Sequence, residues 1–304
     1  MNKLLKYEFR ATLRLYLPLY LVMLGFAVLG RFSLWGVPWE VTVQEDLVGW
    51  TNLSVSVAGT GVGNEVLAIL LNIVLAGNVL VLLGAMVVHF IITLQRFWKN
   101  LMGDEGYLMF TLPVSTGELL WSKAICAFVW GVVTALMVLL SVLVLAWHPQ
   151  LIQAVKQGLS TIAPEEWQLI LQMLHNVLPP VMWPILVAEA VISGVGDLFL
   201  LYSAMAIGHT VKNHKVLASV GAYGIISMVL GTAASLLMNL LLPLMAGIPQ
   251  DIQLNSLSEL LLFSYQIGRF MTGIWLVALV IDLLSAIGGF LLARHLLNTQ
   301  LNLE

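Results

Sequence analysis

Long apolar runs separated by short polar stretches dominate the chain. Six of them are poor in charge and long: about residues 15–35, 66–94, 124–147, 181–208, from 216 onward, and 270–293. A helix needs about 20 apolar residues to cross the ~30 Å core of a bilayer. A transmembrane β-barrel is excluded, because its strands alternate polar and apolar residues in runs of about ten. The pattern therefore predicts an all-α, polytopic membrane protein with six transmembrane helices in a single transmembrane domain, residues 1–304.

The first 14 residues carry a regular basic pattern. Four cations recur at spacings of three and four, which places them on one face of a helix: Lys3, Lys6, Arg10 and Arg14. Apolar residues lie around the other side, with Glu8 as an interruption. This pattern predicts an amphipathic helix that lies on the membrane surface before the first span. An ordinary basic flank to that span fits the same pattern equally well.

The polar stretch between the second and third runs, residues 95–123, contains signals for a short separate helix. Gly103 suits the left-handed end of the preceding helix, and Asp104 can cap a new one. Residues 105–111 then form one or two turns, which Pro113 ends. Ser115 and Glu118 form an S-x-x-E capping box that starts the next helix.

The short helix is unusual because it carries four consecutive apolar residues, Tyr107 to Phe110, between two polar hinges. Four residues are too few to cross a bilayer, and the hinges hold them near water. An apolar surface of this kind, exposed on a membrane protein, predicts docking into a groove of another protein.

Two segments on the other side of the predicted bundle also have helical signals. Within residues 148–180, Pro164 opens an amphipathic helix with Glu165 and Glu166 in its first turn. The uncharged run of residues 216–250 is roughly 50 Å long as one helix, well above the ~30 Å core. Prolines and a glycine near its end, and a capping box at Ser256 and Glu259, predict a broken, re-entrant outer hairpin with a helical piece at residues 257–267.

Composition and charge strengthen the membrane assignment and orient it. Hydrophobic residues make up 60% and charged residues 10% of the chain, whereas a soluble domain carries roughly 25% charged residues. Six spans put both termini on one side, together with ten of the 13 Lys and Arg residues. The positive-inside rule therefore predicts that both termini and the 95–123 loop are cytoplasmic. Residues 148–180 then lie outside.

Three acidic residues fall inside the predicted spans: Glu189, Asp197 and Asp282. Ionisable groups in a membrane are costly and are candidates for a substrate or ion pathway. Hydrogen bonds to neighbouring helices, or hydration near an interface, would also explain them without such a role, and the sequence favours this structural explanation. The sequence contains no phosphate-binding loop, no H-E-x-x-H zinc motif and no nucleophile elbow. We therefore expect no catalytic residue, no metal and no cofactor on this chain. We also expect no nucleic-acid partner.

Two stretches carry a family resemblance: NKLLKYEFRATLRLYLP at the N-terminus and RFWKNLMGDEGYLMFTLPVSTGELLWSK after the second span. Together with six spans, they resemble the permease subunits of ABC transporters of the type-2 exporter class. The likeness is greatest to permeases that accompany a separate ATPase in Gram-positive bacteria, including exporters of antimicrobial peptides and drugs. The resemblance implies an N-terminal elbow helix, an outer re-entrant hairpin and a cytoplasmic coupling helix, whose contact residues are Gly103, Asp104, Glu105, Gly106, Tyr107, Leu108, Phe110 and Pro113.

The function implied by this resemblance is the export of a substrate, such as an antimicrobial peptide, a drug or a lipid. A separate nucleotide-binding subunit would hold MgATP and hydrolyse it, so this chain itself is not an enzyme. A second copy or a related permease would complete the transporter in a bacterial plasma membrane. Two alternatives remain open: a proton- or ion-coupled secondary transporter that uses the carboxylates within the spans, and an ATPase-linked membrane sensor.

Overall fold

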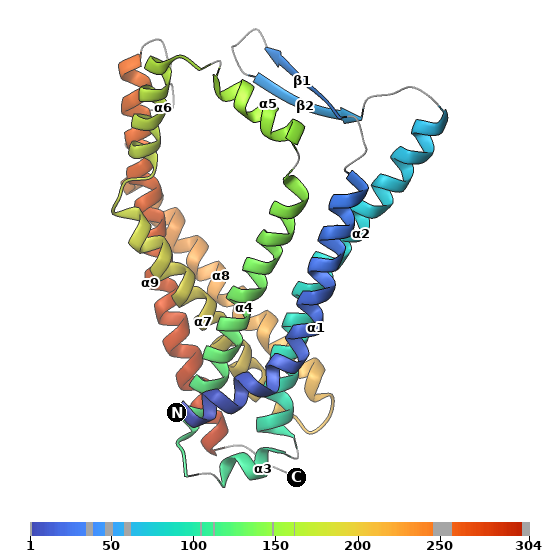
Figure 1. The fold of residues 1–304 in the computed structure, drawn as a ribbon. Coiled ribbons are helices and arrows are strands. Elements are labelled where there is room, and N and C mark those ends of the chain that lie inside the picture. Colours follow the sequence, from blue (N-terminus) through green and yellow to red (C-terminus); the bar gives the residue numbers. More distant parts are fainter. Residues whose placement is uncertain are drawn as a thin grey trace. The chain divides into compact units, whose positions relative to one another are not determined.

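The computed structural model describes residues 2–34, 39–45, 51–57, 62–103, 105–111, 113–147, 149–160, 162–245 and 257–299 (Figure 1). Within these ranges six helices are long and apolar enough to cross a membrane. They are α1 (Asn2–Leu34), α2 (Val62–Phe97), α4 (Thr116–Ala146), α7 (Met182–His209), α8 (Lys215–Met245) and α9 (Leu257–Thr299). Each contains one of the six apolar runs, which confirms the prediction of a helical, multi-pass membrane protein.

Shorter elements connect these helices. They are β1 (Trp39–Glu45), β2 (Thr51–Val57), the π-helical turn η1 (Trp98–Met102), α3 (Glu105–Phe110), α5 (Pro149–Ser160) and α6 (Pro164–Val177). Helix α3 confirms the predicted one or two turns before Pro113, and α6 confirms the helix that opens at Pro164. The antiparallel pair β1–β2 and helix α5 are additions that the sequence pattern did not predict.

Helix α1 contains both the predicted basic segment and the first apolar run. Its helical hydrogen bonding continues from one into the other, although Pro18 lies inside the helix and removes one backbone donor. The first turns of α1 lie at an angle to the rest of the helix (Figure 1), and the predicted surface elbow stays a prediction. The buried side chains of α1 recur every three or four residues along this whole length, beginning with Glu8, Thr12 and Tyr16. Glu8 therefore belongs to the buried stripe of the helix and does not interrupt it.

Helix α9 corrects a predicted boundary. The predicted piece at residues 257–267 and the sixth span form one continuous helix of 43 residues. A charged residue such as Arg269 at the edge of an apolar run does not end a helix, because its backbone hydrogen bonds are unaffected. Helix α8 extends through Pro243 to Met245, and the predicted outer turn and Ser256 lie outside the described residues.

The helices group into two compact units. One consists of Lys6–Thr93 and Val129–Pro164, and the other of Met1–Leu5, Leu94–Phe128 and Glu165–Glu304. In the first unit α1, α2 and α4 meet around Tyr16, whose hydroxyl lies 2.7 Å from Nδ1 of His89 and whose ring stacks on Trp130 with 4.5 Å between centroids. The indole of Trp130 donates to Oγ1 of Thr12 over 2.8 Å. Aromatic stacking and satisfied polar groups together hold this core.

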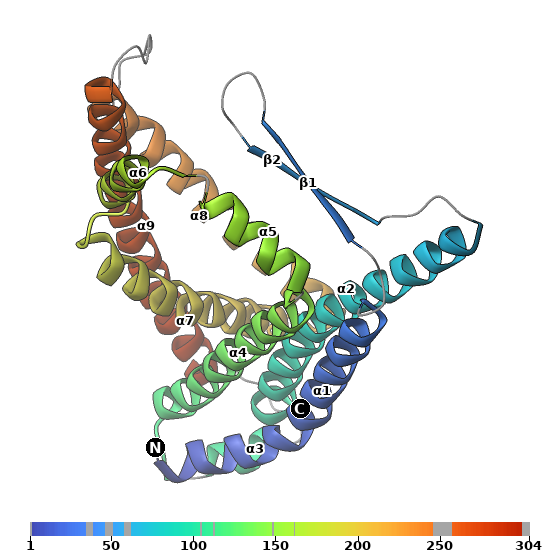
Figure 2. The same cartoon turned by 45° about the horizontal axis from the view of Figure 1, so that its top comes forward.

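The second unit is built on α7, which packs extensively against α9 and α8. Small residues allow the backbones to approach closely, as is common between membrane helices. A Cβ added at Gly289 would lie 3.0 Å from the backbone nitrogen of Leu200, and one added at Gly208 would overlap Ser219. At its other end α9 runs beside α6 in both views (Figures 1 and 2), where the amide of Asn176 donates to Oγ of Ser264 over 2.9 Å.

Candidate functional site

The candidate site is the connection from α2 to α4, which includes η1 and α3. Helix α2 ends in a π-turn, in which the Gly103 amide donates to the Trp98 carbonyl over 2.9 Å. Gly103 has φ −97° and ψ −167°, so the predicted left-handed stop is wrong: the backbone there is extended. The five-residue π-turn already satisfies a terminal carbonyl, and a left-handed residue is not required. The Gly106 amide then donates to the Gly103 carbonyl over 2.8 Å, which begins α3.

A buried polar bridge connects η1, α3 and α4. The groups around the Asn100 side chain assign its amide orientation, with the oxygen toward Lys123 and the nitrogen toward Glu105. In this orientation the oxygen accepts from Nζ of Lys123 over 3.3 Å and the nitrogen donates to Oε2 of Glu105 over 3.1 Å. Asn100 is 5% exposed and Lys123 is 4% exposed. Hydrogen bonds to charged groups are stronger than neutral ones, and more so away from water. The start of α3 is therefore fixed to both flanking helices.

Glu105 has a second partner, Lys99, with 3.6 Å between Nζ and Oε1. Both side chains of this pair are well exposed, so the pair contributes little to stability.

The predicted capping box at the start of α4 is confirmed. The backbone amide of Glu118 donates to Oγ of Ser115 over 3.3 Å, and the amide of Ser115 donates back to Oε2 of Glu118 over 3.2 Å. These reciprocal bonds satisfy amides that the first turn of a helix leaves without partners. The polar bridge thus holds the start of α3, and the capping box fixes the start of α4.

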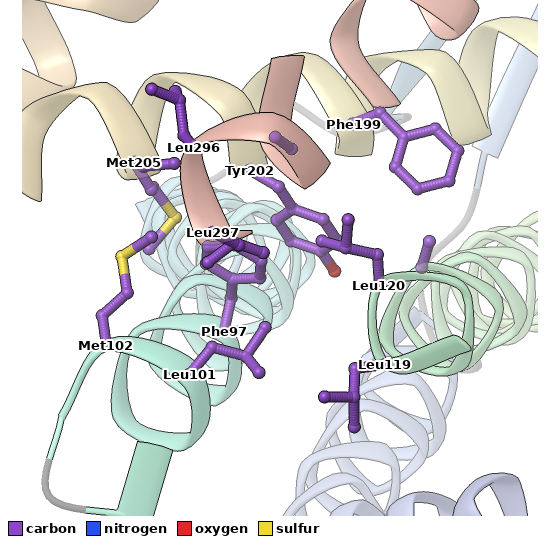
Figure 3. Close-up of a cluster of buried hydrophobic side chains, with 13 residues drawn as sticks. Phe97, Leu101, Met102, Leu119, Leu120, Phe199, Tyr202, Met205, Leu296 and Leu297 are labelled. Carbon is purple, nitrogen blue, oxygen red and sulfur yellow. The ribbon is translucent and has the colours of Figure 1, made fainter. Parts of the chain in front are cut away.

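An apolar core joins this connection to α7 and α9 (Figure 3). Phe97, at the end of α2, is fully buried and stacks on Tyr202 of α7 with 4.1 Å between centroids and 6° between planes. On the α4 side the ring of Trp121 contacts Phe199 of α7 edge-on at 4.9 Å. Met109 and Phe110 of α3 pack against the same core. A displacement of α3 would therefore act directly on the packing of α7 and α9.

His209, the last residue of α7, makes a further contact with η1. Its imidazole is hydrogen-bonded to the backbone of Met102, and its ring meets Trp98 edge-on at 5.8 Å. On its other side Nε2 lies 3.4 Å from Nζ of Lys215, the first residue of α8. One histidine thus connects the π-turn to the start of α8.

The predicted contact residues do not share one environment. Leu108 is 67% exposed, and Glu105 and Pro113 are also exposed. Gly106 is buried and Phe110 faces the core, so neither offers much surface. Asp104 and the side chain of Tyr107 lie outside the described parts. The accessible apolar group that the structure does describe on α3 is Leu108.

The other predicted residues fall into two groups. Lys3, Lys6, Arg10 and Arg14 are all exposed, as a basic face requires. The carboxyl groups of Glu189 in α7 and Asp282 in α9 lie close enough to interact directly, and Asp197 is near enough to Asp282 for electrostatic repulsion. Glu189 is 7% exposed, and its Oε2 has no partner with hydrogen-bond geometry. Asp197 is exposed.

Sequence reasoning missed Asn100, Lys123 and His209. For Asn100 and Lys123 the sequence signal is weak: a polar residue at the end of one apolar run and a cation at the start of the next, 23 positions apart. Within the described ranges no group of three metal-ligating side chains comes together. No family model, curated protein or solved structure matches the chain.

Proposed function

We propose that this protein is the transmembrane subunit of an ATP-binding cassette exporter of the type-2 class, and that α3 is its coupling helix. The observation that supports this most is the asymmetry of α3. Met109 and Phe110 are anchored in the core formed with α7 and α9, whereas Leu108 is exposed. A short helix with one side anchored and the other exposed suits the transfer of a push from a partner into the bundle.

The route of that push follows from the contacts of the connection. A nucleotide-binding subunit that holds MgATP would move α3 when it closes. Because Asn100 ties α3 to Lys123 of α4, and Phe97 stacks on Tyr202 of α7, the movement reaches α4 and α7 together. Close-packed interfaces respond by rigid displacement and not by continuous deformation. Substrate would then be released on the far side of the membrane.

The topology of this proposal places α3 and both termini in the cytoplasm of a bacterial cell. Most Lys and Arg residues lie on that side, which is the orientation that the positive-inside rule favours. A second copy of the chain, or a related permease, would complete the transporter.

Replacing Leu108 with aspartate tests the proposal. The chain is purified from membranes of its host, its associated ATP-hydrolysing subunit is identified by mass spectrometry, and MgATP hydrolysis is measured. We expect Leu108→Asp to lose most of that subunit and its activity, because a charge replaces an exposed apolar contact. The control is Leu171→Asp on α6, where the native leucine is 58% exposed. Retention of the ATPase by Leu108→Asp, or equal loss in the control, would refute the coupling role.

A second candidate is a proton- or cation-coupled secondary transporter, which the facing carboxyl groups of Glu189 and Asp282 favour. Carboxyl pairs within a membrane span are suited to binding a proton or a cation. Transport in proteoliposomes that contain no ATPase, driven by a proton gradient and abolished in Asp282→Asn, would support this candidate. ATP-dependent transport that persists in Asp282→Asn would argue against it.

A further inference from the structure

The junction of α6, α7 and α9 contains a cavity that the coupling role does not use. Its volume is about 520 Å³, and its lining includes His175, Asn176, Tyr265 and Arg269. The cavity continues along α9 to Thr272 and Leu276 and reaches Val181 at the start of α7. One end of the cavity is therefore cationic and polar, and the other end is apolar.

The walls of the cavity are held in a fixed geometry. The side-chain amide of Asn176 donates to Oγ of Ser264 over 2.9 Å and to the carbonyl of Leu261 over 3.4 Å. Directly beside this contact a Cβ at Gly268 would overlap the backbone of Asn176, so only glycine permits the approach. Both bonds tie the end of α6 to α9, and the space next to them is a stable feature of the fold.

Among the residues that the structure describes, the charge of the cavity has no acidic counterpart. No Asp or Glu lines it, and within the described ranges Arg269 makes no ion pair or hydrogen bond. An exposed guanidinium presents five donors in a planar fork, which matches a phosphate or carboxylate group. Tyr265 and His175 add further donors around the same space.

The depth of the cavity agrees with the position of a lipid headgroup. Along α9, Thr272 precedes Ala293, a core residue at the α3 end, by 21 residues. At about 1.5 Å per residue this is roughly 30 Å, the thickness of the hydrocarbon core. With Ala293 taken as the level of one membrane surface, Arg269 and Tyr265 fall at the level of the opposite surface, where tyrosine side chains are enriched. The apolar end of the cavity points along α9 toward the hydrocarbon core.

We propose that this cavity binds the phosphate group of a membrane lipid, with Arg269 contacting the phosphate and the Val181–Leu276 end holding the first part of an acyl chain. The site is independent of whether α3 binds an ATPase. Its ligand chemistry is a phosphate group, which a free phosphate ion also carries, so the two sources must be distinguished by experiment.

The test uses native mass spectrometry of the purified chain in detergent. Phosphatidylglycerol, phosphatidylcholine, diacylglycerol and inorganic phosphate are titrated separately. We expect wild type to bind phosphatidylglycerol most tightly and diacylglycerol least, since diacylglycerol lacks the phosphate. Arg269→Gln should weaken phosphatidylglycerol binding about tenfold, the usual scale for losing a charge-assisted contact. The control Arg294→Gln removes the same charge from an exposed position near the other end of α9 and should leave binding unchanged.

A second variant tests the cavity without altering charge. Gly273 lines the cavity, and Gly273→Leu fills part of it while raising helix propensity, so we expect the variant to fold and to lose lipid binding. If inorganic phosphate binds and its binding depends on Arg269, the site recognises the phosphate group alone. If phosphatidylglycerol binds and inorganic phosphate does not, the site recognises the lipid. Phosphatidylglycerol affinity that is equal in wild type and Arg269→Gln, or equally reduced in Arg294→Gln, would overturn the proposal.

Discussion

Replacing Asn100 with leucine would break the buried bridge while preserving the size of the side chain. The change removes the oxygen that accepts from Lys123 and the nitrogen that donates to Glu105. Lys123 is only 4% exposed, so water cannot readily replace the lost acceptor. We therefore expect the beginning of α3 to open more often while the rest of the bundle remains folded.

The size of the effect follows from the two bonds. A hydrogen bond to a charged group contributes about 1.5–3 kcal/mol, and the exposed Glu105 bond lies at or below the bottom of that range. A net loss of about 2 kcal/mol is reasonable, which corresponds to roughly a 30-fold increase in the population of the opened connection.

Hydrogen exchange measures this population directly, because the amides of Gly103 and Gly106 are bonded only while η1 and the start of α3 are formed. Exchange in the peptide that covers η1 and α3 should accelerate roughly 30-fold in Asn100→Leu, the factor expected for about 2 kcal/mol. Lys99→Gln is the matched control, since it removes the other partner of Glu105, which is a well-exposed ion pair. That control should change exchange less than about fivefold, because exposed pairs contribute from a few tenths to about 1 kcal/mol.

Unchanged exchange in Asn100→Leu would show that the bridge does not hold α3. Equal acceleration in Lys99→Gln would show that Glu105 acts through its exposed partner and that burial of Asn100 and Lys123 is unimportant. A loss of protection throughout the chain would show that the bridge supports the whole bundle and not this connection alone.

Three further predictions concern stability. Gly289→Leu should destabilise the chain by about 3 kcal/mol in thermal unfolding, since its side chain meets the α7 backbone, whereas Gly288→Leu, with open space around it, should not. Ser115→Ala should cost about 1 kcal/mol through loss of the helix cap, seen as faster exchange at the start of α4 and unchanged exchange in α9. Tyr16→Phe should cost about 1–2 kcal/mol in thermal unfolding, because the partly buried Nδ1 of His89 loses its hydrogen-bond partner. Tyr7→Phe, at a side chain that is 71% exposed, should have no effect.

The sequence was most informative where the structure is determined locally. The six spans follow from apolar length alone, and the capping box follows from two residues three positions apart. The β1–β2 pair also has a local signal in the sequence, since apolar and polar residues alternate from Trp39 to Gln44.

One boundary differs in the structure. The predicted piece at residues 257–267 and the sixth span are one helix, α9, because Arg269 between them leaves the backbone hydrogen bonds intact. Gly103 was a similar case: glycine suits a left-handed stop, but the π-turn made one unnecessary.

The candidate site was predictable in position but not in construction. Residues 95–123 contain the short helix in the expected place. The bridge between Asn100 and Lys123, and the stack of Phe97 on Tyr202, join residues far apart in sequence, and such pairs depend on how helices pack. The predicted apolar surface of α3 is divided for the same reason, because Met109 and Phe110 are occupied by that packing.

Site-specific photo-crosslinking from position 108 in intact membranes tests the coupling role most directly. A benzoylphenylalanine replaces Leu108, and a second variant carries it at Leu171 as the control. We predict a crosslinked product from position 108 alone, containing a protein that hydrolyses ATP and has a phosphate-binding loop. No product from position 108, or the same products from both positions, would contradict the assignment of α3 as a coupling helix.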